Sequence, residues 1–133
     1  MLLVDTNILV DVFENDPDWA DWSIGQFRAQ SQVHELAING IVHAELAAAF
    51  DRVEELDDAV DALGLNVLEL PGPALFLAGK AFVNDRRAGG SRVRVLADFL
   101  IGAHAAVAGM PLLTRDARRY RRYFPTVTLL TPD

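Results

Sequence analysis

The sequence predicts an α/β domain with a mostly parallel central sheet of about five short strands and helices on both faces. Short apolar runs alternate along the chain with longer stretches of helical period. The 133 residues are 51% hydrophobic and contain no low-complexity tract, so we expect a single domain over residues 1–133.

The first strand is predicted over Leu2 to Val4, an apolar run that ends directly at Asp5. A short helix from Ile8 to Phe13 follows. The strand therefore delivers Asp5 to the carboxyl edge of the sheet, where open α/β sheets bind ligands. The alternative is that Asp5 or Thr6 only caps the helix. Asp11, on the same helix, is expected to be a surface acid.

The next elements continue the alternation. Asp16-Pro17 predicts the start of a helix that carries Trp19, Trp22 and Phe27, whose rings are expected in the core. Further segments are predicted as a strand at Leu36 to Ile38, a helix at Val42 to Phe50, an amphipathic helix at Asp51 to Leu63, a strand at Val67 to Leu70 and a helix up to about Arg86.

The last part of the chain contributes two more acids. The stretch from Arg86 to Arg94 is predicted to be a positively charged loop at the lip of a site. Asp98 is expected to open a buried helix from Phe99 to Ala108, with helix capping as the alternative role. Three elements complete the prediction: a strand at Met110 to Thr114, a helix at Asp116 to Phe124 and a strand at Val127 to Leu130.

Four acids are expected at one edge of this sheet: Asp5, Glu45, Asp98 and Asp116. Two carboxylates about 4 Å apart repel by about 4 kcal/mol at an effective dielectric of 20, so such a cluster calls for a cation. Oxygen ligands without cysteine favour Mg²⁺ or Mn²⁺, which commonly orient phosphate oxygens and water for displacement. Taken singly, each acid is more often structural, and Glu45 has the setting of a surface residue.

The net charge of −7 argues against a nucleic-acid binder, but the charge is unevenly distributed. Residues 1–79 hold 15 acidic and 2 basic residues, whereas residues 80–133 hold 10 basic and 4 acidic ones. One face can therefore attract phosphate. The lack of cysteine excludes disulfides and thiolate metal sites, and is compatible with the cytoplasm. No apolar run predicts a membrane span, and the start does not resemble a signal peptide.

Four segments together resemble the PIN-domain ribonucleases of the VapC toxin type. They are Val4-Asp5-Thr6-Asn7-Ile8-Leu9, Ala44-Glu45-Leu46, Ala97-Asp98-Phe99-Leu100-Ile101-Gly102-Ala103-His104-Ala105 and Leu112-Leu113-Thr114-Arg115-Asp116. The resemblance covers nearly the whole chain. It implies a Mg²⁺- or Mn²⁺-dependent endoribonuclease that is the toxin of a toxin–antitoxin pair. It also implies a homodimer, and an antitoxin whose tail enters the acidic pocket.

The resemblance also assigns individual residues. The family's acidic, metal-binding positions fall on Asp5, Glu45, Asp98 and Asp116. Thr114 matches the family's hydroxyl beside the fourth acid, and Asn7 matches a position that supports the first acid by hydrogen bonding. Thr6 is counted with these supporting residues. His104 lies off the face of Asp98, so we expect a satisfied core or interface histidine rather than a general base.

Several arginines are candidate RNA contacts. Four of them are spaced i, i+3, i+4 and i+7, which predicts one stripe on a helix beginning beside Asp116: Arg115, Arg118, Arg119 and Arg122. Arg92 and Arg94 in the preceding loop are added to this set. The alternative is that these arginines pair with the acidic first half, a second subunit or an antitoxin. Ala117, Tyr120 and Phe124 are expected to anchor the helix to the core.

Two other functions remain open at this point. A phosphatase with an aspartyl nucleophile also begins with an apolar strand and an Asp. That chemistry requires a second acid two residues after the first, where this chain has Asn7. It also requires a lysine near the phosphate, whereas Lys80 lies in a predicted helix. The other alternative is a non-catalytic PIN-like binding module whose acids hold a structural cation or a basic peptide.

Overall fold

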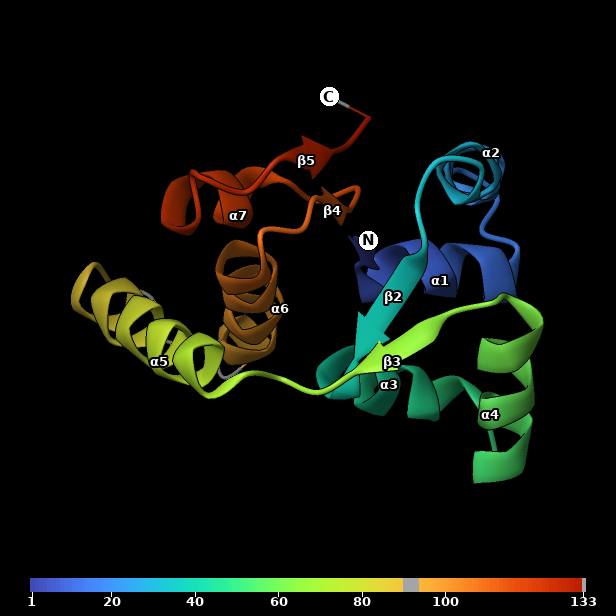
Figure 1. Cartoon of the computed structure of the whole chain (residues 1–133), viewed down its shortest axis with the longest axis horizontal. Helices are drawn as coiled ribbons and strands as arrows, with labels where there is room; N and C mark the ends of the chain where they lie inside the picture. The colour runs from blue at the N-terminus through green and yellow to red at the C-terminus, as the bar shows by residue number, and fades with distance from the viewer. Residues whose placement is uncertain (90–93, 133) are drawn as a thin grey trace.

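The computed structural model describes residues 1–89 and 94–132 and contains one five-stranded sheet (Figure 1). All four strand pairings are parallel, in the order β3-β2-β1-β4-β5. The strands are β1 (Leu2–Val4), β2 (Leu36–Asn39), β3 (Asn66–Leu68), β4 (Leu112–Leu113) and β5 (Leu129–Leu130). The predicted fold class and strand number are confirmed.

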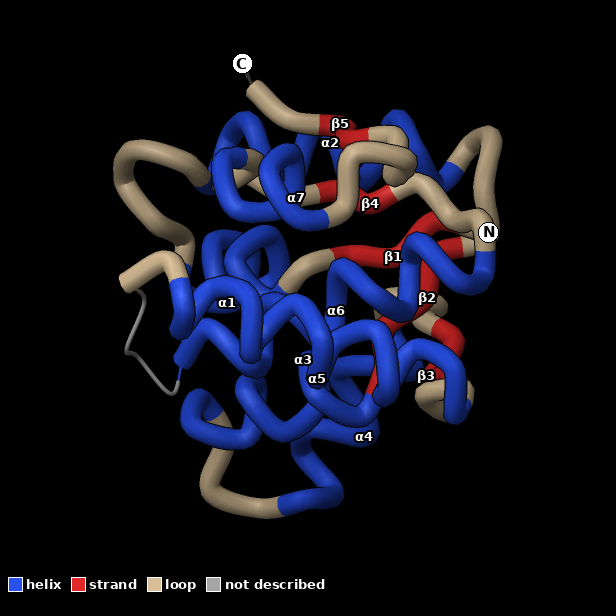
Figure 2. The backbone as a smooth tube through the Cα atoms, turned by 90° about the vertical axis from the view of Figure 1, so that its left-hand side faces the viewer, coloured by secondary structure: helices blue, strands red, loops and turns tan. Residues whose placement is uncertain are grey.

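Helices cover both faces of this sheet (Figures 1 and 2). In Figure 1, α1, α2 and α4 lie to the right of the sheet and α5, α6 and α7 to its left. Their bounds are α1 (Thr6–Glu14), α2 (Ala20–Ser31), α3 (Gly40–Leu46), a 3₁₀ turn (Ala47–Ala49), α4 (Val53–Ala62), α5 (Gly72–Arg87), α6 (Arg94–Ala108) and α7 (Arg118–Tyr123). No described helix combines the length and apolarity needed to cross a membrane.

The strand order reverses between β1 and β4, and this junction positions the site. β1 continues on one side to β2 and β3, whereas β4 leads on the other side to β5. Val4 is paired with Leu113, so Asp5 and Thr114 follow the ends of neighbouring strands. Parallel sheets bind ligands at the carboxyl ends of their strands, at the point where the strand order reverses.

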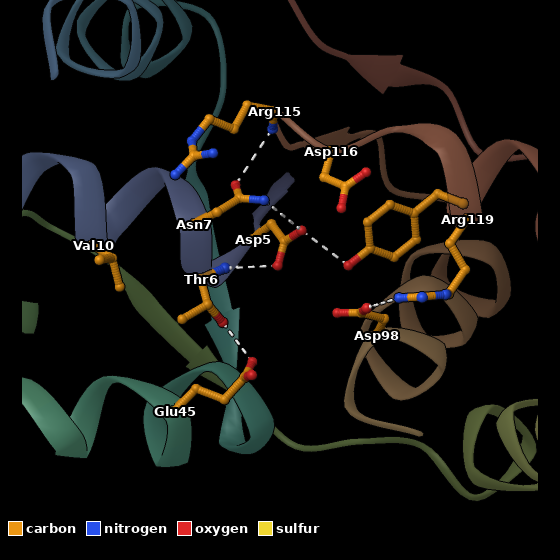
Figure 3. Close-up of a pocket in the computed structure, with 10 residues that line it drawn as sticks. Asp5, Thr6, Asn7, Val10, Glu45, Asp98, Arg115, Asp116 and Arg119 are labelled. Carbon is orange, nitrogen blue, oxygen red and sulfur yellow. Dashed lines mark hydrogen bonds and ion pairs between the residues drawn. The ribbon is translucent and has the colours of Figure 1, made fainter. Parts of the chain in front are cut away.

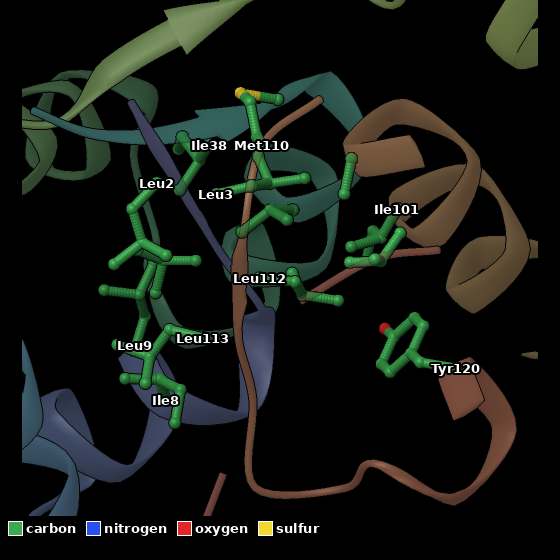
Figure 4. Packing of buried hydrophobic residues seen from close by; sticks show 14 of the residues in the cluster. Leu2, Leu3, Ile8, Leu9, Ile38, Ile101, Met110, Leu112, Leu113 and Tyr120 are labelled. Atoms are coloured by element: carbon green, nitrogen blue, oxygen red, sulfur yellow. The ribbon is translucent and has the colours of Figure 1, made fainter. Parts of the chain in front are cut away.

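The core is built from the strands and the inward faces of the helices (Figure 4). Leu2, Leu3, Leu112 and Leu113 are fully buried, as predicted for strands covered on both faces. Burying each such leucine contributes about 1.5–3 kcal/mol relative to leaving it exposed. The site is therefore placed by a rigid apolar layer directly beneath it.

The contact between α6 and α7 is close because residue 102 is glycine. A Cβ atom built on Gly102 would lie 2.5 Å from the ring of Phe124 and 3.0 Å from that of Tyr120. Ala117, Tyr120 and Phe124 are all buried, so their predicted anchoring role is confirmed. This packing places Tyr120 at the edge of the sheet.

Several predicted boundaries were wrong. Helix α6 begins at Arg94, so Asp98 lies within its first turns and does not open it. Helix α2 begins at Ala20 because Asp16 forms a local turn instead, accepting hydrogen bonds from the backbone N–H groups of Asp18 and Trp19, both at 2.9 Å. Helix α7 begins only at Arg118, which removes Arg115 from the predicted stripe.

Candidate active site

The four predicted acids line one pocket of about 280 Å³ at the carboxyl edge of the sheet (Figure 3). Asp5 follows β1, Glu45 lies on α3, Asp98 on α6, and Asp116 in the loop after β4. Elements far apart in the sequence thus bring four carboxylates to one place. Their roles as metal ligands stay predictions.

Asp5 lies deepest, with only 4% of its surface exposed. It is the N-cap residue of α1, and its Oδ1 accepts a hydrogen bond from the backbone N–H of Thr6 at 2.7 Å. Its Oδ2 accepts from the hydroxyls of Thr114 at 2.8 Å and Tyr120 at 2.9 Å, and more weakly from Asn7 Nδ2 at 3.4 Å. The capping interpretation therefore holds, but it accounts for only one oxygen of this carboxylate.

The pKa of Asp5 is raised from its ordinary 3.8 to about 6, chiefly by burial. The hydrogen bonds from Thr114 and Tyr120 oppose this rise, and the negative charge of Asp98 adds to it. The carboxylate is therefore held in a costly ionised form at neutral pH. A cation in the pocket would lower that cost.

Tyr120 is a residue of the pocket that the sequence did not indicate. It was predicted only as an apolar anchor, yet its hydroxyl donates to Asp5 within the core. Burial, followed by the charges of Asp5 and Asp98, raises the pKa of Tyr120 well above its ordinary 10, so the phenol stays protonated and remains a donor. The available signal was that a buried tyrosine hydroxyl needs a polar partner.

Glu45 stands at the opposite wall of the pocket and is exposed. Helix α3 is started by Asn39, whose Oδ1 accepts from the backbone N–H groups of Ile41 and Val42. The hydroxyl of Thr6 donates to Glu45 Oε1 at 2.7 Å. This bond orients the carboxylate and leaves Oε2 without a described partner.

Asp98 forms an ion pair with Arg119 of α7. Burial raises the pKa of Asp98, the charge of Arg119 opposes this rise, and the charges of Glu45 and Asp116 add to it. Asp98 therefore interacts electrostatically with each of the other three acids. Arg119 places a positive charge beside Asp98 in this pocket.

The loop after β4 is held by a network around Thr114. Its hydroxyl accepts a hydrogen bond from the backbone N–H of Asp116 at 3.1 Å while donating to Asp5. The side chain of Asn7 donates to Thr114 at 3.3 Å and accepts from the backbone N–H of Arg115 at 3.3 Å. The predicted hydrogen bond from Asn7 to the first acid is present, and Asn7 also fixes this loop.

Among the described residues, no three Asp, Glu, His or Cys side chains are grouped closely enough to hold one metal ion as they stand. Glu45 is held by Thr6, and Asp98 by Arg119. The donor set nevertheless fits a hard cation, because it consists of oxygens alone. Mg²⁺ commonly uses only one or two carboxylates directly and reaches other groups through its waters.

Asp11 was wrongly predicted as a surface acid. Its side chain is 1% exposed and accepts two hydrogen bonds from Arg115, from Nε at 2.8 Å and from Nη2 at 2.9 Å. Ser23 of α2 donates to the same carboxylate at 2.7 Å, and the guanidinium carbon of Arg115 lies 5.4 Å from the ring centre of Trp19. Arg115 thus clamps the loop after β4 to helices α1 and α2 and lies outside the predicted helical stripe, whereas its role as an RNA contact stays a prediction.

The other predicted residues lie as follows. Arg118, Arg119 and Arg122 line a second cavity beside the acidic pocket. Arg92 and the side chain of Arg94 lie outside the described residues, so their predicted role is not addressed. His104 is 3% exposed and its Nδ1 lies 3.1 Å from Nδ2 of Asn39, which makes it a satisfied core histidine, as predicted.

The chain is an α/β domain with a parallel sheet, and its acidic pocket lies where the strand order reverses between β1 and β4. The chain belongs to the PIN domain family, whose model matches residues 2–125. The search of curated proteins finds no match to the sequence.

Solved structures support the same fold. The chain is similar to a chain of VapBC2 from Rickettsia felis bound to a DNA fragment from their promoter, with a TM-score of 0.74 and 22% identity over 99% of this chain and 98% of that one. VapBC-1 from nontypeable Haemophilus influenzae gives a TM-score of 0.74 at 20% identity, covering 98% and 96%. FitAcB from Neisseria gonorrhoeae gives 0.66 at 18%, covering 99% and 98%.

Proposed function

We propose that the chain is a metal-dependent endoribonuclease and the toxin of a toxin–antitoxin pair. The observation that carries this proposal is the meeting of four carboxylates from four separate elements in one pocket. Because Asp5 is buried with a raised pKa, the cluster has the character of a site that gains stability from a cation. Phosphodiesters are the substrate class that such a cation would help to hydrolyse, and RNA is the substrate that the resemblance to the VapC type implies.

Asp5, Glu45, Asp98 and Asp116 are the proposed ligands of Mg²⁺ or Mn²⁺. When bound, the cation supplies Lewis-acid activation of water and neutralises charge on the phosphate. The side chains around the acids have the complementary task of holding them in place. Hydrogen-bonding neighbours of this kind orient metal ligands and fix their basicity.

Four hydrogen bonds are the proposed positioning contacts. The hydroxyls of Thr114 and Tyr120 fix one oxygen of Asp5, and the backbone N–H of Thr6 binds the other, so the carboxylate cannot rotate. The Thr6 hydroxyl holds Glu45 across the pocket. One residue pair, Asp5 and Thr6, therefore sets the separation of two proposed ligands.

The proposed partner is an antitoxin protein that covers the acidic pocket, and the proposed assembly is a homodimer. Support comes from the similar structures, which include VapBC2 from Rickettsia felis and VapBC-1 from Haemophilus influenzae. What those structures contain is a property of the other proteins. For this chain the partner and the dimer are part of the proposal.

The phosphatase alternative loses support. Asn7 occupies the position where that chemistry wants a second acid, and its side chain is engaged with Thr114 and the backbone of Arg115. No lysine lines the pocket within the described part of the chain. Lys80 lies on α5 with its Nζ 5.3 Å from the ring centre of Phe76.

The proposal is tested by incubating a labelled single-stranded RNA with the purified protein in Mn²⁺ or in EDTA. We expect cleavage in Mn²⁺ alone, and its loss to background in Asp98→Asn and in Glu45→Gln. Asp58→Asn, an exposed acid on α4, is the matched control and should cleave like the wild type. Cleavage that is equal in EDTA, or equal in all three variants, would refute the assignment. RNA binding without any cleavage would favour the non-catalytic binding module.

A further inference from the structure

A second cavity of about 410 Å³ lies directly beside the acidic pocket. It is lined by Asp85, Asp116, Arg118, Arg119, Arg122 and Tyr123, which we call the arginine groove. Asp116 and Arg119 also line the acidic pocket, so the two cavities share a wall. A long ligand bound in one of them therefore passes close to the other.

The arginine groove offers free positive charge. Arg118 and Arg122 are exposed, and within the described residues neither forms an ion pair. Arg122 lies with its guanidinium carbon 5.2 Å from the ring centre of Tyr123. The carboxylate of Asp85 is partly satisfied by a 2.7 Å hydrogen bond from the Tyr123 hydroxyl. The groove therefore presents unpaired guanidinium groups next to a fixed wall.

The fold fixes which arginines of α7 face this groove. Tyr120 and Phe124 are buried, which anchors one side of the short helix to α6. Arg118 and Arg122 are four residues apart and therefore share a face of the helix. Arg121 is exposed on the same helix but does not line the groove. It provides a control with the same charge, helix and exposure class.

We propose that the arginine groove binds the backbone phosphates that flank the scissile phosphate of the RNA, with Arg118 and Arg122 as the contacts. This inference rests on the proposed function. Guanidinium groups present forked N–H donors that match phosphate oxygens. Residues 1–79 carry 15 acidic and 2 basic residues, so much of the remaining chain repels a polyanion. The groove is the place beside the pocket where unpaired arginines can offset that repulsion.

An acidic segment of a protein partner is the rival occupant. A nucleic-acid strand is favoured because it carries a charged phosphate at every nucleotide, so one strand can serve both adjoining cavities. A phosphodiester backbone can place one phosphate at a cation in the pocket and the next ones along the arginines. Its contacts should be independent of base sequence.

The test is fluorescence anisotropy of a labelled single-stranded RNA over a series of KCl concentrations at constant Mn²⁺. An Asp5→Asn parent, first shown not to cleave, keeps the RNA intact. Arg118→Ala with Arg122→Ala is compared with Arg121→Ala in that parent. Each lost phosphate contact on a single strand lowers the slope of log affinity against log salt by about 0.7, so the double variant should lose about 1.4. Its affinity should fall about equally for RNAs of different sequence, while Arg121→Ala keeps the parent slope.

The outcomes separate the two proposals. If the wild type cleaves RNA in Mn²⁺ but the double variant keeps the parent slope and affinity, the groove assignment is wrong. If the double variant loses no more than Arg121→Ala, the effect is general charge and the assignment is also wrong. If the wild type neither binds nor cleaves RNA, the proposed function itself fails.

Discussion

Replacing Arg115 with alanine should destabilise the whole domain, because it leaves the buried charge of Asp11 without its partner. Asp11 is 1% exposed and receives two charge-assisted hydrogen bonds from Arg115, at 2.8 and 2.9 Å. Ser23 alone would remain as a described donor to this carboxylate. The clamp joins α1, α2 and the loop that carries Asp116, so its loss reaches the site as well.

The expected cost follows from the burial of the two partners. Removing one partner of a fully buried ion pair costs about 3–5 kcal/mol. The Arg115 side chain is 29% exposed, so water can partly replace it, and we expect about 2–3 kcal/mol. The entropy of unfolding is about 2.1 cal/mol/K per residue, so for 133 residues this loss corresponds to a fall in Tm of about 7–11 °C.

The assay is urea denaturation followed by circular dichroism at pH 7, with thermal melting as a second measurement. Arg121→Ala removes an exposed arginine from the same region and should change the free energy of unfolding by less than about 0.5 kcal/mol. Arg115→Ala combined with Asp11→Asn should recover part of the loss, since no buried charge is then left unpaired. A cost for Arg115→Ala no larger than that of the control would refute the clamp.

Three further predictions concern the pocket. The raised pKa of Asp5, about 6 when folded against 3.8 as its ordinary value, means that the folded protein binds this proton more tightly. The free energy of unfolding of the metal-free protein should therefore fall by about 3 kcal/mol as the pH rises from 3.8 through 6. Urea denaturation across this pH range measures the fall, which should be absent in Asp5→Asn. Tyr120→Phe removes one hydrogen bond to Asp5, so the pKa of Asp5 should rise and the loss of stability should extend to higher pH. An unchanged dependence of stability on pH would contradict this prediction. Arg119→Gln removes the positive charge that would compete with a metal ion for Asp98, so Mn²⁺ binding measured by calorimetry should tighten severalfold. Weaker binding would contradict this competition.

The order of elements was predictable because apolar strands buried on both faces are legible in the sequence. Leu2–Val4 and Leu36–Asn39 lie where their apolar runs indicate; the first is followed by Asp5, and the second ends at Asn39. The start of α6 was misplaced because Asp98 resembles a helix cap, whereas the helix already includes the four residues before it. A favourable capping residue does not show whether the preceding turn is also helical.

The contacts of the site were harder to predict. Asp11 and Arg115 are 104 residues apart in the sequence, so no local pattern indicates that they meet. Helical spacing alone suggested that Arg115 joins Arg118 and Arg122, but the helix begins three residues later than that spacing assumed. The hydroxyl of Tyr120 reaches Asp5 only because Gly102 lets α7 approach α6. These features depend on tertiary packing.

The central claim is that the acidic pocket holds a divalent cation, and calorimetric titration of Mn²⁺ into the metal-free protein tests it most directly. We expect saturable binding to the wild type, unchanged binding to Asp58→Asn, and binding weakened about tenfold or more in Asp98→Asn, because one proposed carboxylate ligand is neutralised. No saturable binding to the wild type, or equal affinity in Asp98→Asn, would contradict the account.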